Sequence, residues 1–374
     1  MHLRSYPSLA RSMMRCAILF VVASRAIAIT LPDVSRAEAL RTLALPLGGV
    51  AAFRGGAALA VVGQPRAPAL PSPVGCRVAR VPASDGSGSC RVKIFYPAAA
   101  PAPEDAPYCL DGRATSDGMA GLVGFRQLGL AFLLAHLADA PSGCGLDAAP
   151  VATKLPLLVY SHGFGGNADM ASYFLSEVAA AGSVVAAVEH TDGTASNTVL
   201  EDGTALPFAP GRLSRREQLD RRAGELVDVA KALRGADGLP PLGETFLGGH
   251  SYGGPSALLA ASRFACAGLV LHDPALGMGY SSEVAARTVS FTSDEYDAAG
   301  VRCGATFHCR GAFHGNFVDA PLWAPPWVMR PLSSVIPAAG PVDPSLAHAA
   351  LAAAAATFMR GGDVAPDGFF ERRA

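Results

Sequence analysis

The sequence predicts an α/β fold, in which helices flank a mostly parallel central sheet. Half of the 374 residues are hydrophobic and 16% are charged, a composition that can build one large core. After residue 73, short apolar runs bounded by turn residues alternate with longer helical stretches, which is typical of such a sheet. The predicted strands are residues 91–96, 155–160, 183–188, 245–247, 268–271, 288–291 and 305–308, and the predicted helices are residues 171–181, 215–233, 254–263 and 345–359.

The chain before residue 74 has the features of a targeting segment followed by a linker. In residues 1–30, several arginines precede a short apolar run and then Ala26-Ile27-Ala28, the layout of a secretory signal. The run is too short to span a bilayer, for which about 20 apolar residues are needed. Residues 31–73 end in a stretch rich in proline and alanine, typical of a processed segment or linker, so residues 74–374 form the predicted folded domain. We expect secretion, with import into a plastid or another organelle as the alternative, because residues 43–62 form a second apolar stretch with an arginine in it.

Charge and cysteine spacing argue against two kinds of partner. The formal net charge is −1, so no field of one sign is available to hold nucleic acid. The cysteines form no Cys-x-x-Cys pair and no Cys/His cluster at zinc spacing, so we expect no metal site. In a secreted chain some of them would pair, and we expect Cys76 with Cys90 and Cys109 with Cys144, which leaves an odd thiol.

The strongest motif is Gly249-His250-Ser251-Tyr252-Gly253, which lies between a predicted strand and a predicted helix. This strand-turn-helix context is that of the nucleophile elbow of the α/β-hydrolase fold, with Ser251 as the nucleophile. So sharp a turn needs small residues two positions before and after the serine, and both positions are glycine. The turn also directs the backbone N–H of Tyr252 toward the oxyanion site, at a helix N-terminus that favours negative charge. In a glycine-rich chain the bare motif can arise by chance, and the flanking elements are what make it specific.

A second glycine motif precedes the elbow. The buried strand at residues 155–160 runs into Ser161-His162-Gly163-Phe164-Gly165. In this fold a His-Gly-x-Gly turn supplies the other oxyanion N–H, because glycines let the backbone approach the substrate carbonyl. We assign that donor to Phe164, and an ordinary turn after a strand is the alternative.

The general base must follow the nucleophile, since the chain order in this fold is serine, acid, histidine. Four histidines follow Ser251. His308 falls within the last predicted strand, His348 falls within the terminal helix, and His272 ends a strand. His314 lies in a loop just past the last strand, where the base is normally delivered, and is the predicted base.

The acid has two candidates on fold logic alone. Asp273 follows the strand after the elbow, and Asp294 follows the next strand. Most enzymes of this fold use the later position, that of Asp294. On fold logic alone, however, the two candidates are nearly tied.

From residue 74 onward the chain resembles the platelet-activating factor acetylhydrolases, the lipoprotein-associated phospholipase family of the α/β-hydrolase superfamily. The matched stretches are Val74-Gly75-Cys76, residues 91–97, residues 155–165, residues 184–192 with Glu189-His190-Thr191-Asp192, the elbow, and His314-Gly315-Asn316-Phe317-Val318-Asp319. The resemblance implies Asp273 as the acid, because the family places it directly after the strand that follows the elbow. It also implies a calcium-independent esterase without a cofactor, which acylates Ser251 with the short or oxidised sn-2 chain of a phospholipid.

The match fades between Asp111 and Asp147. There, the apolar stretch from Gly118 to Leu137 has helical spacing and few charges. The resemblance implies a neighbouring surface for a membrane or lipoprotein, and a buried lid or core helix is the alternative. Trp323, Trp327 and Met329 could add to such a surface or line the acyl pocket.

Two other functions stay open. A cutinase-like enzyme, a dienelactone hydrolase or a general carboxylesterase would have the same elbow and triad on another ester. A non-catalytic relative of the fold would normally have lost the serine, the histidine or an elbow glycine, and none of these is missing here.

Overall fold

The structure is a computed structural model that describes residues 65–122, 124–126, 129, 131–279, 284–297, 300, 302–324, 326, 329 and 339–373. The predicted targeting segment, residues 1–30, and most of the predicted linker lie outside these residues. No helix in the described part is long and apolar enough to cross a membrane. Residues 65–73 lie against the domain, where Pro65 is buried and the backbone N–H of Arg66 donates to the carbonyl of Leu322 at 2.8 Å.

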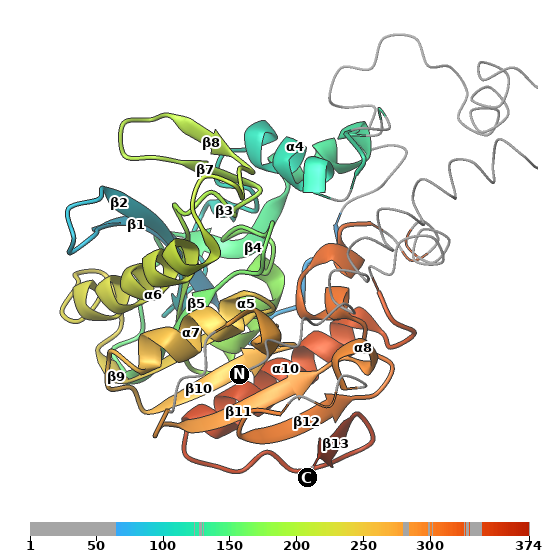
Figure 1. Cartoon of the computed structure of the whole chain (residues 1–374). Coiled ribbons are helices and arrows are strands. Elements are labelled where there is room, and N and C mark those ends of the chain that lie inside the picture. Colours follow the sequence, from blue (N-terminus) through green and yellow to red (C-terminus); the bar gives the residue numbers. More distant parts are fainter. Residues whose placement is uncertain are drawn as a thin grey trace, which may run out of the picture.

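The predicted strands all lie in one sheet, whose central strands are parallel (Figure 1). In spatial order these are β12 (Ala305–Cys309), β11 (Arg287–Thr292), β10 (Gly268–His272), β9 (Leu242–His250), β5 (Leu155–Ser161) and β6 (Val184–Glu189). The next strand, β2 (Ser89–Pro97), runs antiparallel to β6. The predicted α/β class is therefore confirmed.

The sheet continues beyond the predicted strands at both edges. On the β2 side it adds β1 (Val74–Pro82), β4 (Pro141–Leu146) and β3 (Asp105–Pro107), and on the other side it adds β13 (Phe370–Arg373) beside the C-terminus (Figure 1). A separate hairpin joins β7 (Asn197–Val199) to β8 (Ala205–Pro207). These strands are short or half exposed, so their sequences lack the continuous apolar runs of the central strands.

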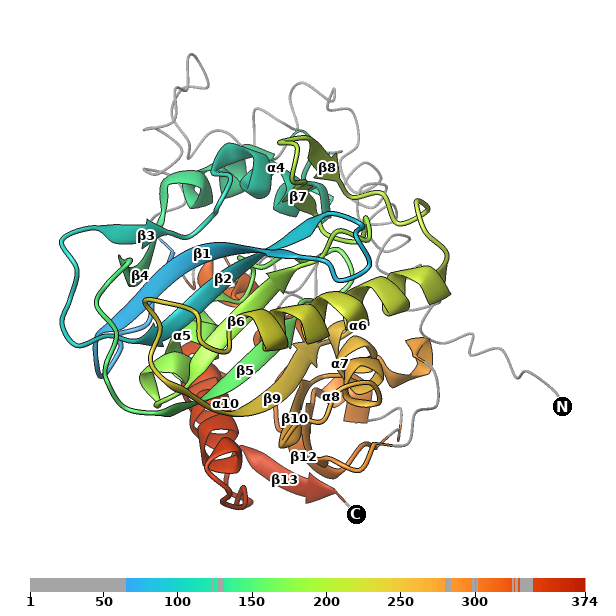
Figure 2. The same ribbon diagram turned by 90° about the vertical axis from the view of Figure 1, so that its left-hand side faces the viewer.

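Two pairs of helices cover the two faces of the sheet. Helices α5 (Ser172–Ala180) and α10 (Pro344–Met359) pack on one face, and α6 (Arg215–Ala232) and α7 (Gly253–Ala261) pack on the other (Figure 2). Side chains of β6 alternate between the two cores: Val185 lies in the core with α5 and α10, and Val184 and Ala186 lie in the core with α6 and α7. Burial on both faces explains why central strands such as β5 and β6 consist mainly of apolar residues.

The terminal helix starts where the sequence predicts, with Asp343 as its N-terminal cap. The Asp343 carboxylate accepts hydrogen bonds from the backbone N–H groups of Ser345 at 2.9 Å and Leu346 at 3.2 Å, and Pro344 occupies the first turn. Gly361 follows the helix in the left-handed region, with φ of 84°. The helix begins and ends where these residues allow.

The stretch from Gly118 to Leu137 does not form one continuous helix, which corrects the helical spacing inferred for it. Helix α4 (Arg113–Leu122) ends early, and a 3-10 helix, η1 (Ala131–Asp139), follows. Gly124 and Gly129 between them have φ of 79° and 71°, a backbone that interrupts a right-handed helix. Among the described residues of the stretch, Met119, Leu134 and Leu137 are buried in one cluster, while Leu122 and Phe132 are exposed. This burial favours the packing alternative over a surface role for most of the segment.

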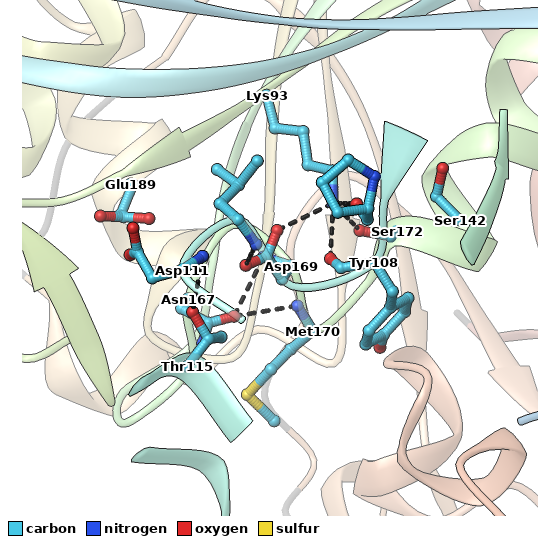
Figure 3. Close-up of polar contacts among 12 residues, drawn as sticks. Lys93, Tyr108, Asp111, Thr115, Ser142, Asn167, Asp169, Met170, Ser172 and Glu189 are labelled. Carbon is cyan, nitrogen blue, oxygen red and sulfur yellow. Dashed lines mark hydrogen bonds and ion pairs between the residues drawn. The ribbon is translucent and has the colours of Figure 1, made fainter. Parts of the chain in front are cut away.

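A buried ion pair ties the segment around Tyr108 and Leu110 to the sheet (Figure 3). The ammonium of Lys93, on β2, lies 2.8 Å from the Asp169 carboxylate and donates to the carbonyl of Tyr108 at 2.7 Å. The other Asp169 oxygen accepts from the backbone N–H of Leu110 at 2.9 Å. Because both charges are fully buried, losing either partner would leave an uncompensated charge inside the protein.

The cysteine pairs considered from the sequence are not formed. All seven described cysteines are free. In the β1–β2 hairpin Cys76 lies opposite Phe95, whereas Cys90 lies opposite Val81, so the two thiols are about 17 Å apart along the strands. A disulfide needs Cα atoms within about 7 Å. Burial also raises the pKa of Cys76 to about 11 and that of Cys144 to about 12, which keeps these thiols protonated and unreactive.

Candidate active site

Ser251 lies at the tip of a tight turn between β9 and α7. Its φ is 54°, a left-handed conformation that costs energy for a residue with a side chain and exposes the hydroxyl. The glycines on either side are required sterically. A Cβ on Gly249 would lie 2.5 Å from the carbonyl carbon of Gly253, and one on Gly253 would lie 2.0 Å from the carbonyl oxygen of Ser161 on β5. The local geometry is that of a nucleophile elbow.

Asp273 and His314 meet beside this turn. The carboxylate Oδ2 of Asp273 lies 2.5 Å from Nδ1 of His314, and its Oδ1 accepts a hydrogen bond from the backbone N–H of Ser293 at 2.7 Å. Asp273 is fully buried, and it too has a positive φ, of 46°. The Asp273 carboxylate therefore orients the imidazole of His314, and the Ser293 N–H holds that carboxylate in place.

The other candidates for acid and base are engaged elsewhere. Asp294 lies 3.2 Å from Nε2 of His308 and accepts from the backbone N–H of Gly311. His272 contacts the Tyr160 hydroxyl at 3.0 Å, and burial lowers its pKa to about 3. His348 contacts the carbonyl of Asn316 at 3.1 Å, and burial lowers its pKa to about 4. Of the side chains weighed from the sequence, Asp273 and His314 are the pair that the fold brings together.

The two segments proposed to carry the oxyanion N–H groups lie next to each other. Phe164 is in the turn after β5, and Tyr252 is at the first position before α7; their rings meet edge to face with centroids 5.7 Å apart. Gly163 lies against the nucleophile, since a Cβ there would be 3.1 Å from Cβ of Ser251. The backbone of the glycine turn therefore reaches Ser251, as an oxyanion hole beside that residue would require.

Two further side chains at the site were missed by sequence reasoning. The ring of Tyr296 stacks on His314 with centroids 4.8 Å apart and an angle of 5° between the planes. Burial and the nearby Asp273 raise the pKa of Tyr296, while a hydrogen bond with the Ser251 hydroxyl opposes that rise. The His250 ring also contacts His314, with centroids 4.4 Å apart, and burial together with His314 holds the pKa of His250 far below its usual value. His314 thus packs against two aromatic rings. The Ser-Asp-Glu-Tyr segment after a strand was the only available signal for Tyr296.

In the part of the chain that the structure describes, the Ser251 hydroxyl is hydrogen-bonded to Tyr296, whereas His314 is paired with Asp273. In proteins without bound substrate, the contact between nucleophile and base is often long and tightens in the complex. No group of three or more His, Cys, Asp or Glu side chains in the described part has the geometry of a metal site.

The loop that carries His314 is tied to α5 by Asp319. Its buried carboxylate accepts from the backbone N–H groups of Tyr173 at 2.8 Å and Phe174 at 3.2 Å, and from the Tyr108 hydroxyl at 3.0 Å. Since α5 has no capping side chain of its own, Asp319 caps this helix from a distant part of the chain. The helix in turn fixes the position of the His314 loop.

Replacing Asp319 with alanine should lower the free energy of unfolding by about 3 kcal/mol, because three buried donors lose their carboxyl acceptor. Urea denaturation followed by circular dichroism measures this. The matched control is Asp343→Ala, which removes the exposed cap of α10 and should cost about 1 kcal/mol. Equal losses in the two variants would show that Asp319 is only an ordinary cap.

Apolar side chains surround the glycine turn. Leu122 at the end of α4 packs against Gly165, and Phe208 meets the Phe164 ring edge to face at 5.4 Å. Leu122 and Phe208 are both partly exposed. Trp323 is instead buried and donates to the Tyr108 hydroxyl at 2.7 Å, and Met329 is buried. Trp327 lies outside the described residues. The described apolar rim of the site thus comes from α4, the glycine turn and the segment after β8.

Comparisons with known proteins agree with this architecture. The family model for platelet-activating factor acetylhydrolase, isoform II, matches residues 62–233. Among solved structures, a ferulic acid esterase from Streptomyces cinnamoneus is similar, with 22% sequence identity and a TM-score of 0.64, over 82% of this chain and 97% of that chain. An esterase named Est22 is 14% identical, with a TM-score of 0.42, over 77% of this chain and 82% of that chain.

The matched family span contains Phe164 and ends before Ser251, Asp273 and His314. The similarity to the ferulic acid esterase extends over nearly all of the described domain and establishes the fold. The resemblance seen in the sequence is supported: the chain has the α/β-hydrolase fold, and residues 62–233 match the family model for platelet-activating factor acetylhydrolase, isoform II.

Proposed function

We propose that this protein hydrolyses the short or oxidised sn-2 acyl ester of phospholipids through an acyl-enzyme on Ser251. The observation that carries the chemistry is the 2.5 Å contact between Asp273 and His314 beside a serine with φ of 54°. The family match at residues 62–233 supports the phospholipid substrate.

In the first half-reaction, Oγ of Ser251 attacks the ester carbonyl carbon while Nε2 of His314 takes the hydroxyl proton. Asp273 holds the imidazole through Nδ1 and stabilises the imidazolium. The carbonyl oxygen becomes an oxyanion and accepts hydrogen bonds from the backbone N–H groups of Phe164 and Tyr252. When the intermediate collapses, the C–O bond to the glycerol breaks, and His314 returns the proton to the departing lysophospholipid.

In the second half-reaction, water attacks the acyl-enzyme. His314 removes a proton from that water, a second oxyanion forms in the same hole, and the Ser251 oxygen leaves with the proton from His314. The fatty acid or acetate is released, and the enzyme is restored. Every proton transfer uses a side chain of this chain.

The substrate is tested by offering the full-length protein two lipids in the presence of a chelator. One has an acetyl group at sn-2 and the other has a palmitoyl group, and both share the same ether chain and head group. We expect rapid release of acetate alone, lost in Ser251→Ala. Equal cleavage of both lipids would contradict the limit on chain length.

A carboxylesterase acting on another ester is the second candidate function, favoured by the apolar rim of Leu122, Phe164 and Phe208, which would suit any small ester with an apolar face. Cleavage of p-nitrophenyl acetate without cleavage of either lipid would support this alternative and overturn the phospholipid proposal.

A further inference from the structure

Arg222 is a fully buried cation at the back of the candidate oxyanion hole. It lies on α6, and its side chain has no exposed area. Its Nε pairs with the Asp192 carboxylate at 2.8 Å, and its Nη1 donates to the carbonyl oxygen of His162 at 2.6 Å. Its Nη2 donates to the hydroxyl of Thr194. The guanidinium thus joins the end of β5 to the loop that follows β6.

The contact with His162 leads directly to the peptide group that carries the Phe164 N–H. The His162 ring donates from Nδ1 to the carbonyl oxygen of Gly163 at 2.8 Å, and the same oxygen accepts from the backbone N–H of Gly166 at 3.0 Å. The Gly163 carbonyl and the Phe164 N–H belong to one planar trans peptide, so fixing the carbonyl fixes the direction of the N–H.

The guanidinium also contacts the residue that carries the other proposed donor. The Arg222 carbon Cζ lies 4.9 Å from the centroid of the Tyr252 ring, a cation–π contact with the residue that follows the nucleophile. One side chain therefore contacts the supports of both donors, just after β5 and at the start of α7.

The surrounding charges are arranged to keep Arg222 in one position. Burial alone would raise the pKa of Asp192, but Arg222 and His190 hold it well below its usual value, so the ion pair stays charged. Behind it, His190 bridges Ser161 at 2.7 Å and Glu225 at 2.6 Å. Ser161, His190 and Glu225 resemble a second triad in their order of contacts, but Ser161 has no exposed surface and can meet no substrate. They serve as packing around the guanidinium.

We propose that Arg222 is a positioning residue that sets the direction of both oxyanion N–H groups. It touches no substrate and acts through His162 and Tyr252. The inference rests on the serine-esterase chemistry of the proposed function, and it does not depend on the lipid substrate. Loss of the guanidinium should therefore weaken binding of the transition state and leave binding of the ester unchanged.

The test compares Arg222→Lys with wild type on p-nitrophenyl acetate, with enzyme concentration set by active-site titration. Lysine keeps the charge and much of the volume, but its single nitrogen cannot reach Asp192 and the His162 carbonyl with the same fork of donors. We expect kcat to fall by about 10²-fold with KM unchanged, as when one oxyanion donor is lost. The inhibition constant of an aryl trifluoromethyl ketone, which forms a tetrahedral oxyanion on the serine, should rise by a similar factor.

The matched control is Lys93→Met, which breaks the buried Lys93–Asp169 pair without touching the glycine turn. It should lower the unfolding midpoint in urea and leave kcat and the inhibition constant per active site unchanged. If Arg222→Lys yields no folded protein, Asp192→Asn carries the test, because it keeps the guanidinium but removes its charged partner; kcat and ketone affinity should again fall together.

A merely structural role for Arg222 would lower the unfolding midpoint with kcat and ketone affinity at wild-type values, and that result would overturn the proposal. A rise in KM with kcat unchanged would overturn it too. If wild type cleaves p-nitrophenyl acetate but no phospholipid, the phospholipid proposal fails. The Arg222 proposal can then still be tested on p-nitrophenyl acetate. If wild type neither cleaves the ester nor binds the ketone, both fail.

Discussion

Replacing Asp273 with asparagine should lower kcat by about 10⁴-fold while the fold is retained. The asparagine carbonyl can still accept from the Ser293 N–H, which Asp273 Oδ1 accepts at 2.7 Å. Its amide group then faces Nδ1 of His314 and donates to it, whereas the carboxylate accepts from it at 2.5 Å. The imidazole is thereby held in the tautomer that carries the proton on Nε2, and it cannot take the proton of Ser251. Steady-state kinetics on p-nitrophenyl acetate, together with a urea unfolding curve, measures both parts of this expectation.

The control for this prediction is Asp294→Asn. Asp294 was the rival acid in the sequence, and it contacts His308 at 3.2 Å rather than His314. We expect kcat close to wild type. A loss of about 10⁴-fold in Asp294→Asn, with Asp273→Asn active, would reverse the assignment of the acid.

Replacing Gly253 with alanine should destabilise the protein by about 3 kcal/mol or more and leave little active enzyme. The added Cβ would lie 2.0 Å from the carbonyl oxygen of Ser161 and 3.1 Å from that of His162. Both atoms are backbone of the central strand β5 and of the turn that follows it, so relief of the clash must move β5 or the elbow itself. Either movement displaces Ser251 from the glycine turn. Urea denaturation and residual activity at low temperature measure the two effects.

Gly224→Ala is the matched control for that substitution. Gly224 lies in the interior of α6, and a Cβ there would meet no atom within 4 Å. Alanine should stabilise this helix by up to about 1 kcal/mol and leave kcat unchanged. If Gly253→Ala were as stable and active as Gly224→Ala, the steric account of the elbow would be wrong.

The central strands and main helices could be predicted from the sequence because their determinants are local. Strands such as β5 and β6 are buried on both faces and consist mainly of apolar residues, and α10 carries its own cap at Asp343. Strand β1, between β2 and β4, was missed because its second half alternates between half-buried and exposed residues, among them Arg77 and Arg80. Its pairing with β2 depends on tertiary contacts that a local pattern does not contain.

The elbow was recognisable in the sequence for the same reason. It requires glycine at fixed positions around Ser251, and the structure gives the steric cause. The choice between Asp273 and Asp294 could not be made from residues alone, since both follow strands and only the distance to His314 separates them. The family resemblance, not the spacing, pointed to Asp273.

Residues that act from a distance left little trace in the sequence. Arg222 lies in a charged helix with many solvated arginines, and nothing in the local sequence marks it as the buried one. Asp319 caps a helix that begins at Ser172, far away along the chain. For the apolar segment from Gly118 to Leu137 the local pattern was misleading. Its periodicity indicated one helix, but its glycines divide it into two.

The most direct test of the account is covalent labelling of the full-length protein with diisopropyl fluorophosphate, followed by intact mass measurement and peptide mapping. The reagent phosphorylates an activated serine and expels fluoride, so a single adduct marks the nucleophile. We predict one adduct, on Ser251, that forms in step with the loss of esterase activity, and none in Ser251→Ala. An adduct on another serine that accounts for the lost activity, or full esterase activity in Ser251→Ala, would contradict the assignment of Ser251 as the nucleophile.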